Sequence, residues 1–171
     1  MKKILNYLLV FISFVVVMYF SMIVFLYPKT HSSIVSTYAS NYNIDKNLVY
    51  AIIYAESKFD EFAVSRTNAR GLMQLSEQTF LWIASQVNEV QDFDRAFDVE
   101  TNIKYGCYYL SYLKDKYDNN SFIICAYNAG ETVVSSWMSD RKFDKNKIEY
   151  KETEMYYERV MYAKKIYELK R

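Results

Sequence analysis

The sequence has few of the residues that interrupt regular structure: 3 glycines and 1 proline among 171 residues. A β-rich fold needs frequent tight turns, so this scarcity disfavours such a fold and favours helices. Hydrophobic residues make up 51% of the chain and aromatic residues 18%, which indicates a folded protein rather than a disordered one. The composition therefore predicts an all-α protein.

The sequence also has few residues that can bind a metal ion or act through a thiol. The chain has two cysteines, Cys107 and Cys125, a single histidine, His31, and no Cys-x-x-Cys pair. This inventory excludes a zinc site and a cysteine–histidine nucleophile. We expect both cysteines to be reduced and buried in the core, with a disulfide between neighbouring helices as the alternative if the domain is exported.

A long apolar run, Ile4–Tyr27, opens the chain and is interrupted only by Asn6, Ser13 and Ser21. It exceeds the roughly 20 residues that span a bilayer as a helix, whereas a cleaved signal peptide usually has an apolar region of about 7–15 residues. No convincing cleavage site follows, and no cysteine stands just after the run, which excludes a lipoprotein anchor. We expect residues 1–29 to form an uncleaved signal anchor, a transmembrane helix, with a cleaved signal and secretion as the alternative.

Charges near this run predict its orientation. Lys2 and Lys3 precede it and Lys29 follows it, a bias that favours a cytoplasmic N-terminus and a folded domain, residues 30–171, outside the cytoplasm. We thus expect a single-pass protein of the cell membrane. Apart from these three lysines the chain has 18 basic and 20 acidic residues. Nucleic-acid binding requires a basic patch, so this balance disfavours nucleic acid as a partner.

The exported part contains a series of polar residues, each followed by apolar residues at helical spacing. Between two of them, residues 58–70 show no helical period and predict a loop, with a short β-hairpin as an option. Gly130 suits the left-handed position just past a helix end. A helix is expected after each of Ser32 or Ser33, Asp45, Ser76, Asp98, Ser121 and Thr153, and a short one is expected around Val133, Val134 and Trp137.

Glu56 is the first candidate for chemistry. It ends a strongly apolar helical stretch, residues 48–55. A carboxyl held partly out of water has a raised pKa because its charged form loses solvation, and such a group can act as a general acid near neutral pH. The alternative on spacing alone is a surface glutamate at a helix end.

Two short motifs offer polar groups for a ligand. Gly71-Leu72-Met73-Gln74 combines a glycine that allows close backbone approach with an amide that donates and accepts hydrogen bonds, which suits an acetamido group. Ala126-Tyr127-Asn128-Ala129-Gly130 places a hydroxyl and an amide near a helix end, where they can orient a carboxyl or a ligand. Taken singly, each motif is also explained by ordinary loop, core and capping roles.

The order of the motifs along the chain is more specific than any single motif. Glu56-Ser57 is followed by GLMQ, then Asn102-Ile103 with Gly106 and Tyr109-Leu110, then AYNAG, then Tyr150-Lys151-Glu152-Thr153. Across roughly Ile44–Tyr167 the chain resembles the lytic transglycosylase domain of the soluble-transglycosylase type, which is related in fold to goose-type lysozyme. The resemblance implies a lysozyme-like helical domain that binds and cleaves the glycan strands of bacterial peptidoglycan.

The resemblance also implies roles for single residues. Glu56 matches the catalytic glutamate, and Asn102 and Gly106 match a structural helix pattern without chemistry. Tyr127 matches the tyrosine that hydrogen-bonds and positions the catalytic carboxyl. The residues implied to bind substrate are Ser57, Gln74, Tyr127, Asn128 and Glu152. Two departures from the family pattern are Ser76 in place of a methionine that lines the cleft and Glu149 in place of a proline.

The implied reaction cuts the β-1,4 bond between N-acetylmuramic acid and N-acetylglucosamine. Glu56 protonates the glycosidic oxygen and then accepts the proton of the sugar's own C6 hydroxyl, which closes a 1,6-anhydro ring without metal or cofactor. An ordinary glycosidase needs a second carboxylate, and Glu152 is the acid that could hold a water and make the enzyme a hydrolytic muramidase. A non-catalytic peptidoglycan-binding scaffold on the same fold is the other alternative.

Overall fold

The computed structural model describes residues 2–117, 119–139 and 151–170. The chain divides into two compact units, Met1–Thr30 and His31–Arg171. In the first unit, helix α1 covers Lys2–Leu26, and its stretch Lys3–Leu26 is long and apolar enough to cross a membrane. A signal sequence meets the same criterion, so the helix by itself leaves anchor and signal open.

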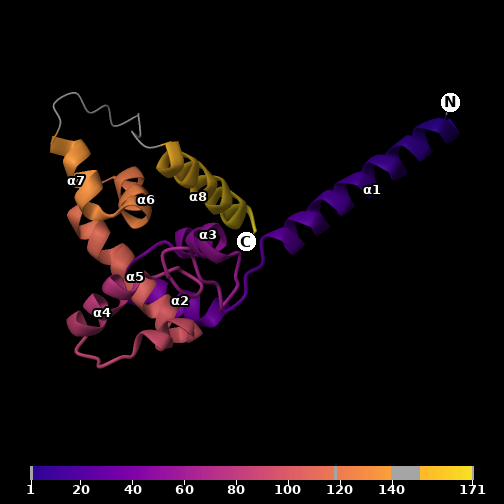
Figure 1. Cartoon of the computed structure of the whole chain (residues 1–171). Helices are drawn as coiled ribbons and strands as arrows, with labels where there is room; N and C mark the ends of the chain where they lie inside the picture. Colours follow the sequence, from indigo (N-terminus) through magenta and orange to yellow (C-terminus); the bar gives the residue numbers. More distant parts are fainter. Residues whose placement is uncertain (1, 118, 140–150, 171) are drawn as a thin grey trace. The chain divides into compact units, whose positions relative to one another are not determined.

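The second unit is helical throughout its regular structure, which confirms the all-α prediction (Figure 1). Within the described residues no regular strand occurs, and the loop after α3 has only two isolated antiparallel bridges, Val64 to Arg70 and Arg70 to Leu75. Its helices are α2 (Ser32–Asn41), α3 (Lys46–Ser57), α4 (Glu77–Gln86), the short 3-10 helix η1 (Phe93–Phe97), α5 (Val99–Lys116), α6 (Asn120–Ala129), α7 (Glu131–Ser139) and α8 (Lys151–Leu169).

Three predicted helix starts are confirmed by their capping hydrogen bonds. The Asp45 side chain accepts from the backbone N–H of Asn47, the Ser76 side chain from that of Thr79 and the Asp98 side chain from that of Thr101. Each bond satisfies one of the amide donors that a helix N-terminus leaves without an intrahelical partner. These caps begin α3, α4 and α5, of which α3 and α4 flank the segment that contains the loop and GLMQ.

Other predicted helix ends were wrong in detail. Helix α2 already begins at Ser32, and the residue before it, His31, takes the cap position in a left-handed conformation without a side-chain cap. Asn119, not Ser121, caps α6, because neighbouring polar side chains can serve equally well. Thr153 lies buried inside α8. Gly130 has φ 89° and ψ 148°, which is positive in φ but outside the left-handed helical region.

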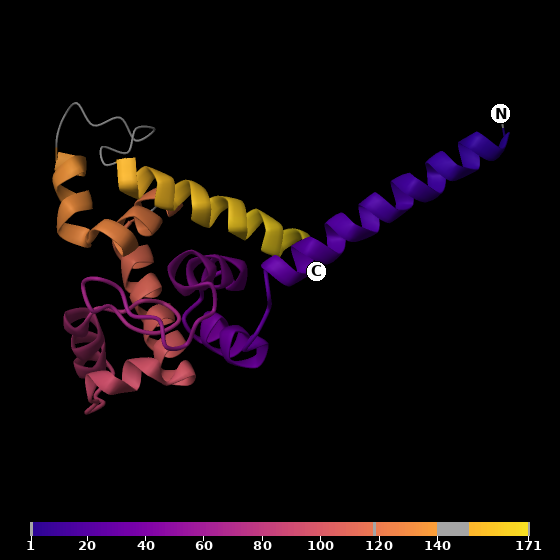
Figure 2. The ribbon, with the colours of Figure 1, turned by 45° about the vertical axis from the view of Figure 1, so that its right-hand side comes forward.

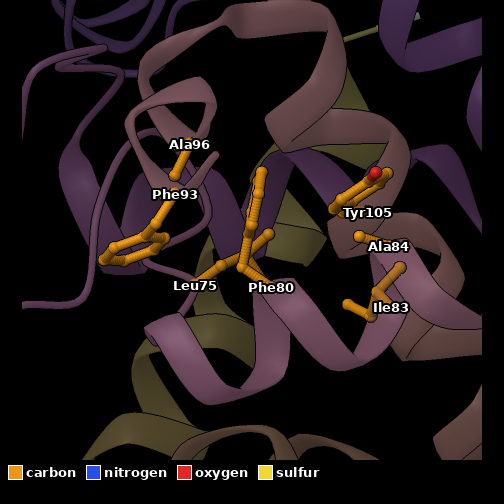
Figure 3. Packing of buried hydrophobic residues seen from close by; sticks show 7 residues of the cluster. All are labelled: Leu75, Phe80, Ile83, Ala84, Phe93, Ala96 and Tyr105. Atoms are coloured by element: carbon orange, nitrogen blue, oxygen red, sulfur yellow. The ribbon is translucent and has the colours of Figure 1, made fainter. Parts of the chain in front are cut away.

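The long helix α5 forms the centre of the second unit and packs against α2, α4, α6 and η1. Figure 3 shows the apolar cluster on its α4 side. In that cluster the Phe80 ring lies 4.8 Å from the ring centre of Tyr105 and 5.7 Å from that of Phe93. Both cysteines, Cys107 on α5 and Cys125 on α6, are buried and free, as predicted, and the disulfide alternative is not formed.

The GLMQ segment is fixed to α5 by an amide and two glycines. The Asn102 side chain accepts from the Met73 backbone N–H at 2.8 Å and donates to the Ala96 carbonyl oxygen at 2.7 Å. A Cβ on Gly71 would lie 2.2 Å from the Ala96 oxygen, and a Cβ on Gly106 would lie 2.1 Å from the Met73 sulfur. Glycine is therefore required at position 71, where the clash is with backbone, and a Cβ at position 106 would displace the buried Met73 side chain, which confirms the structural role expected for Asn102 and Gly106.

Helix α8 lies across α3 and α6, as both views show (Figures 1 and 2). Its buried face carries Tyr156, Val160, Ala163 and Tyr167, the residues predicted for it, and the Tyr167 ring stacks on that of Tyr50 at 5.2 Å. This packing brings the first turns of α8 to the C-terminal end of α3, where Glu56 lies.

Candidate active site

Glu56 stands at the end of a helix whose preceding turns are buried. The stretch 48–53 of α3 is wholly buried, and the helix ends at Lys58, a left-handed residue whose N–H donates to the Tyr54 carbonyl oxygen. Ser57 secures this end, since its hydroxyl donates to the Ile53 carbonyl oxygen at 3.2 Å and accepts from the Phe59 N–H at 3.1 Å. The local sequence thus holds the Glu56 carboxyl at the edge of the core.

A pocket of about 380 Å³ opens at this carboxyl. It falls within the 300–1,000 Å³ that is common for ligand sites. It brings together Glu56, Gln74, Tyr127, Asn128 and Glu152, which the sequence places in four separate segments. Ser57 is absent from this lining, and its hydroxyl is engaged with the backbone as described. Sequence reasoning missed the rest of the lining, which comes from the loop after α3: Ser65, Arg66, Thr67 and Ala69.

Burial controls the acidity of Glu56. It raises the pKa of the carboxyl to about 7, against the lowering effects of a hydrogen bond from Tyr156 and of the positive charge of Arg159. Removing a carboxylate from water penalises its charged form, and here that penalty exceeds both favourable interactions. The carboxyl is therefore partly protonated near neutral pH, which a general acid requires.

The tyrosine that contacts Glu56 is not the one predicted. The Tyr127 hydroxyl donates to the Met73 carbonyl oxygen at 2.9 Å, whereas the Tyr156 hydroxyl donates to Glu56 Oε1 at 2.7 Å. The predicted hydrogen bond from Tyr127 to Glu56 was therefore wrong, although Tyr127 lines the pocket. Burial, followed by the charge of Glu56, raises the pKa of both phenols well above the ordinary value, so both stay neutral.

A sequence signal for Tyr156 existed. It follows Glu152 by one helical turn, so the two side chains lie on one side of α8. Tyr156 also fits the apolar spacing of α8 with Val160 and Ala163, and because of this spacing the sequence predicted it to be a core residue. Both descriptions hold, because the Tyr156 ring is buried while its hydroxyl reaches the carboxyl.

Gln74 has a positive φ of 48°, and its amide nitrogen donates to the carbonyl oxygens of Ala63 at 3.0 Å and Gly71 at 2.8 Å. These bonds close the loop after α3 onto the GLMQ turn. Among the described residues this leaves the amide oxygen as the Gln74 group that a ligand's N–H can reach. The expected pairing of Gln74 with an acetamido group can therefore use one hydrogen bond, from the acetamido N–H to the Gln74 amide oxygen.

Charged groups complete the pocket. Glu152 on α8 and Arg66 on the loop are both exposed, so they lie on the solvent side of the pocket, whereas Glu56 lies on its core side. The described lining therefore contains one acid that burial keeps partly protonated and one that is solvated. Two carboxyls in such different environments can take different chemical roles.

Comparison with known proteins places these features in context. A model of the family described as the transglycosylase SLT domain matches residues 33–150. The membrane-bound lytic murein transglycosylase F of Desulfosudis oleivorans is 36% identical over 99 residues, which are 54% of this chain and 20% of that protein. The membrane-bound lytic murein transglycosylase C of Photorhabdus laumondii is 35% identical over 115 residues, which are 59% of this chain and 32% of that protein.

The fold comparison agrees with these sequence matches. The crystal structure of the 70 kDa soluble lytic transglycosylase of Escherichia coli is similar with a TM-score of 0.78 and 27% identity, over 85% of this chain and 25% of that one. The chain spans about a fifth to a third of the length of the curated relatives it matches. Family model and fold both agree with the resemblance expected from the order of the motifs.

Proposed function

Because this chain belongs to the transglycosylase SLT family, we propose that its His31–Arg171 unit is a lytic transglycosylase that cleaves peptidoglycan. The observation that carries the proposal is the Glu56 carboxyl, which lines a pocket, has a pKa raised to about 7 and accepts a hydrogen bond from Tyr156. A pure binding protein has no need for a carboxyl kept partly protonated at the wall of its binding pocket.

The proposed substrate bond is the β-1,4 linkage between N-acetylmuramic acid and N-acetylglucosamine. Protonated Glu56 gives its proton to the glycosidic oxygen, and the bond from that oxygen to the anomeric carbon breaks. Positive charge develops at the anomeric carbon, where the neighbouring acetamido group of the sugar can stabilise it. Such substrate assistance removes the need for a second catalytic carboxylate.

The second step returns Glu56 to its starting state. Its carboxylate accepts the proton of the C6 hydroxyl of the muramic acid, and the C6 oxygen forms a bond to the anomeric carbon. The products are a 1,6-anhydro sugar and a free 4-hydroxyl on the leaving saccharide, so no water is consumed. The Tyr156 hydroxyl stabilises the carboxylate formed between the two steps, because a hydrogen bond to the charged form favours it.

The remaining pocket residues are proposed to hold the strand. The Gln74 amide oxygen and the Asn128 amide suit the acetamido and hydroxyl groups of sugars. Glu152 accepts hydrogen bonds from sugar hydroxyls, and Arg66 meets anionic groups such as the carboxylates of muramic acid stem peptides. Tyr127 is proposed to fix the position of Met73 while its ring lines the pocket.

Membrane attachment is the second part of the proposal. We propose that residues 1–29 anchor the protein through α1 and that residues 30–171 act outside the cytoplasm. The length and apolarity of α1 support this, as do Lys2 and Lys3 before the apolar stretch. Relatives described as membrane-bound lytic murein transglycosylases point the same way.

The identity of the product tests the reaction. The full-length protein in detergent is incubated with purified peptidoglycan, and the released muropeptides are analysed by mass spectrometry. We expect 1,6-anhydro-muramic acid ends from the wild type and none from Glu56→Gln. Muramic acid ends that carry an added water would contradict the transglycosylase proposal.

Hydrolysis remains the second candidate because Glu152, an exposed acid, lines the same pocket. In an inverting hydrolase a second carboxylate activates water about 6.5–9.5 Å from the acid. Under this candidate Glu152→Gln stops release of hydrated ends, whereas under transglycosylation the variant weakens binding and still yields anhydro ends.

A further inference from the structure

The outer side of α8 carries a stripe of exposed apolar side chains. Met155, Tyr162 and Leu169 are 58%, 61% and 74% exposed and follow one another at intervals of seven residues. Seven residues make almost two helical turns, with a drift of only about 20°, so the three side chains lie on one side of the helix. The buried face of α8, which carries Val160 and Ala163, packs against α3 and α6. The stripe therefore remains accessible to a partner.

Two residues of opposite charge flank the stripe. Glu158 and Lys165 are both exposed and lie on the same flank, since they are also seven residues apart. That interval is about 10.5 Å along the helix axis, so the two side chains are too far apart to pair with each other. The ion pairs of α8 among the described residues join Lys164 to Asp45 and to Glu168. Both flanking charges are thus available to a partner.

This pattern is complementary to itself when two copies of α8 run antiparallel. A two-fold axis beside Tyr162 places this ring against its own copy, and it places Met155 against Leu169 of the second copy, because each lies seven residues from position 162. Glu158 comes four residues before position 162 and Lys165 three residues after it, so the two meet across the axis with an offset of about 1.5 Å. An isologous dimer contains two such pairs.

The charges distinguish this arrangement from its alternatives. A parallel pair of helices would set Glu158 against Glu158 and Lys165 against Lys165 of the second copy, and like charges repel. A helix that lies on a membrane is typically rich in Lys and Arg on its polar face, whereas α8 also exposes Glu154 and Glu168. The pattern therefore favours a second copy of the chain as the occupant of the stripe.

We propose that α8 is a homodimerisation surface, on which two copies of this chain pair antiparallel through Met155, Tyr162 and Leu169. One pair of helices buries less than the roughly 1,200 Å² of a standard interface, so the dimer is weak, with a dissociation constant on the order of 10 μM. The inference goes beyond the proposed function and does not depend on it, since other residues line the pocket at Glu56.

Sedimentation equilibrium of the full-length protein in density-matched detergent measures the association. We expect the wild type to change from monomer to dimer between about 1 and 100 μM. Glu158→Lys and Lys165→Glu each convert both ion pairs into like-charge contacts, so each variant alone should associate about tenfold more weakly. An equimolar mixture of the two variants should recover the wild-type affinity, because every contact across the axis again joins opposite charges.

Cysteine cross-linking tests the antiparallel register. Tyr162→Cys should form a disulfide-linked dimer under mild oxidation, whereas Met155→Cys and Leu169→Cys should do so only when the two variants are mixed. Met161→Cys, at an exposed position, is the matched control and should not cross-link, because its side chain points about 100° away from that of residue 162. Both native cysteines are buried, and the wild type measures any contribution from them.

Three results would overturn the inference. The first is a wild type that stays monomeric at about 100 μM, ten times the expected dissociation constant. The second is association that the charge variants leave unchanged, which would assign the contact to another surface such as α1. The third is protection of Tyr162→Cys from a water-soluble maleimide in phosphatidylcholine vesicles that hold one copy each, which would make lipid the occupant. Absence of anhydro product would concern the proposed function alone.

Discussion

Glu56 and Glu131 each accept a hydrogen bond from a tyrosine hydroxyl, yet their pKa values are shifted in opposite directions. Glu56 accepts a hydrogen bond from Tyr156 at 2.7 Å, and Glu131 accepts one from Tyr112 at 2.8 Å. Yet the pKa of Glu56 is raised to about 7, whereas that of Glu131 is lowered. A hydrogen bond from a tyrosine therefore does not decide whether a carboxyl can serve as an acid.

Burial and direct ion pairing make the difference. At Glu131 the hydrogen bond from Lys116 is the largest contribution and lowers the pKa, while the carboxylate keeps access to water. At Glu56 desolvation is the largest contribution and raises the pKa, and the positive charge of the exposed Arg159 opposes it only through its field. The comparison indicates that burial makes Glu56 an acid, with the hydrogen bond from Tyr156 limiting the rise of its pKa.

The largest effect is expected from removing each carboxyl in turn. Glu56→Gln should lower the turnover of peptidoglycan by about 10³-fold, since general acid catalysis of this kind contributes about 10²–10⁴-fold. Glu131→Gln, which touches no reacting atom, should keep turnover within about tenfold. Release of soluble muropeptides measures both, and equal losses in the two variants would remove the distinction between the glutamates.

The two tyrosines give the next comparison. Tyr156→Phe deletes an interaction that favours the charged form of Glu56, so the pKa of Glu56 should rise further. Because activity requires the protonated acid, the alkaline limb of the pH–rate profile should move to higher pH, while kcat falls about tenfold as the carboxylate intermediate loses its donor. Tyr112→Phe should leave the limb in place. A simple structural defect would lower the rate without moving the limb.

The sequence could predict interactions between residues close together in the chain better than contacts between distant helices. Asp45, Ser76 and Asp98 were identified as caps because a cap bonds to backbone within three residues. The motif order gathered Gln74 and Glu152 into one site through a family resemblance. The pairing of Tyr156 with Glu56 escaped prediction, since it depends on how α8 packs across α3, and a tertiary contact of that kind leaves only an ambiguous helical spacing in the sequence.

Stability should depend on pH with opposite sign at the two glutamates. The folded pKa of Glu56 lies above its unfolded value near 4.5, so its contribution is fully present below about pH 4.5 and is lost as pH rises through about 7. Glu56→Gln should therefore raise the free energy of unfolding relative to wild type at pH 8 by about 2–3 kcal/mol and change it little at pH 4.

Glu131 should behave in the reverse way. Its folded pKa is lowered, so its contribution is present above the unfolded pKa and is lost as pH falls through the folded one. Glu131→Gln should lower stability at pH 8, by about 0–1 kcal/mol because the ion pair is partly exposed. Urea unfolding of the full chain in detergent at both pH values measures the signs, and equal signs would contradict the assignment of burial to one acid and ion pairing to the other.

The smallest effect is expected from Arg159, whose charge lowers the pKa of Glu56 and whose guanidinium lies 5.7 Å from the Tyr156 ring centre. Arg159→Gln should move the alkaline limb up by a few tenths of a pH unit, since an exposed charge is strongly screened by water. About 0.5 M salt should shrink the shift, because screening shortens its reach. Lys165→Gln makes the same charge change at another exposed position of α8 and should leave the limb in place. If both variants move it equally, the shift reports net charge alone, and Arg159 has no specific influence on the acid.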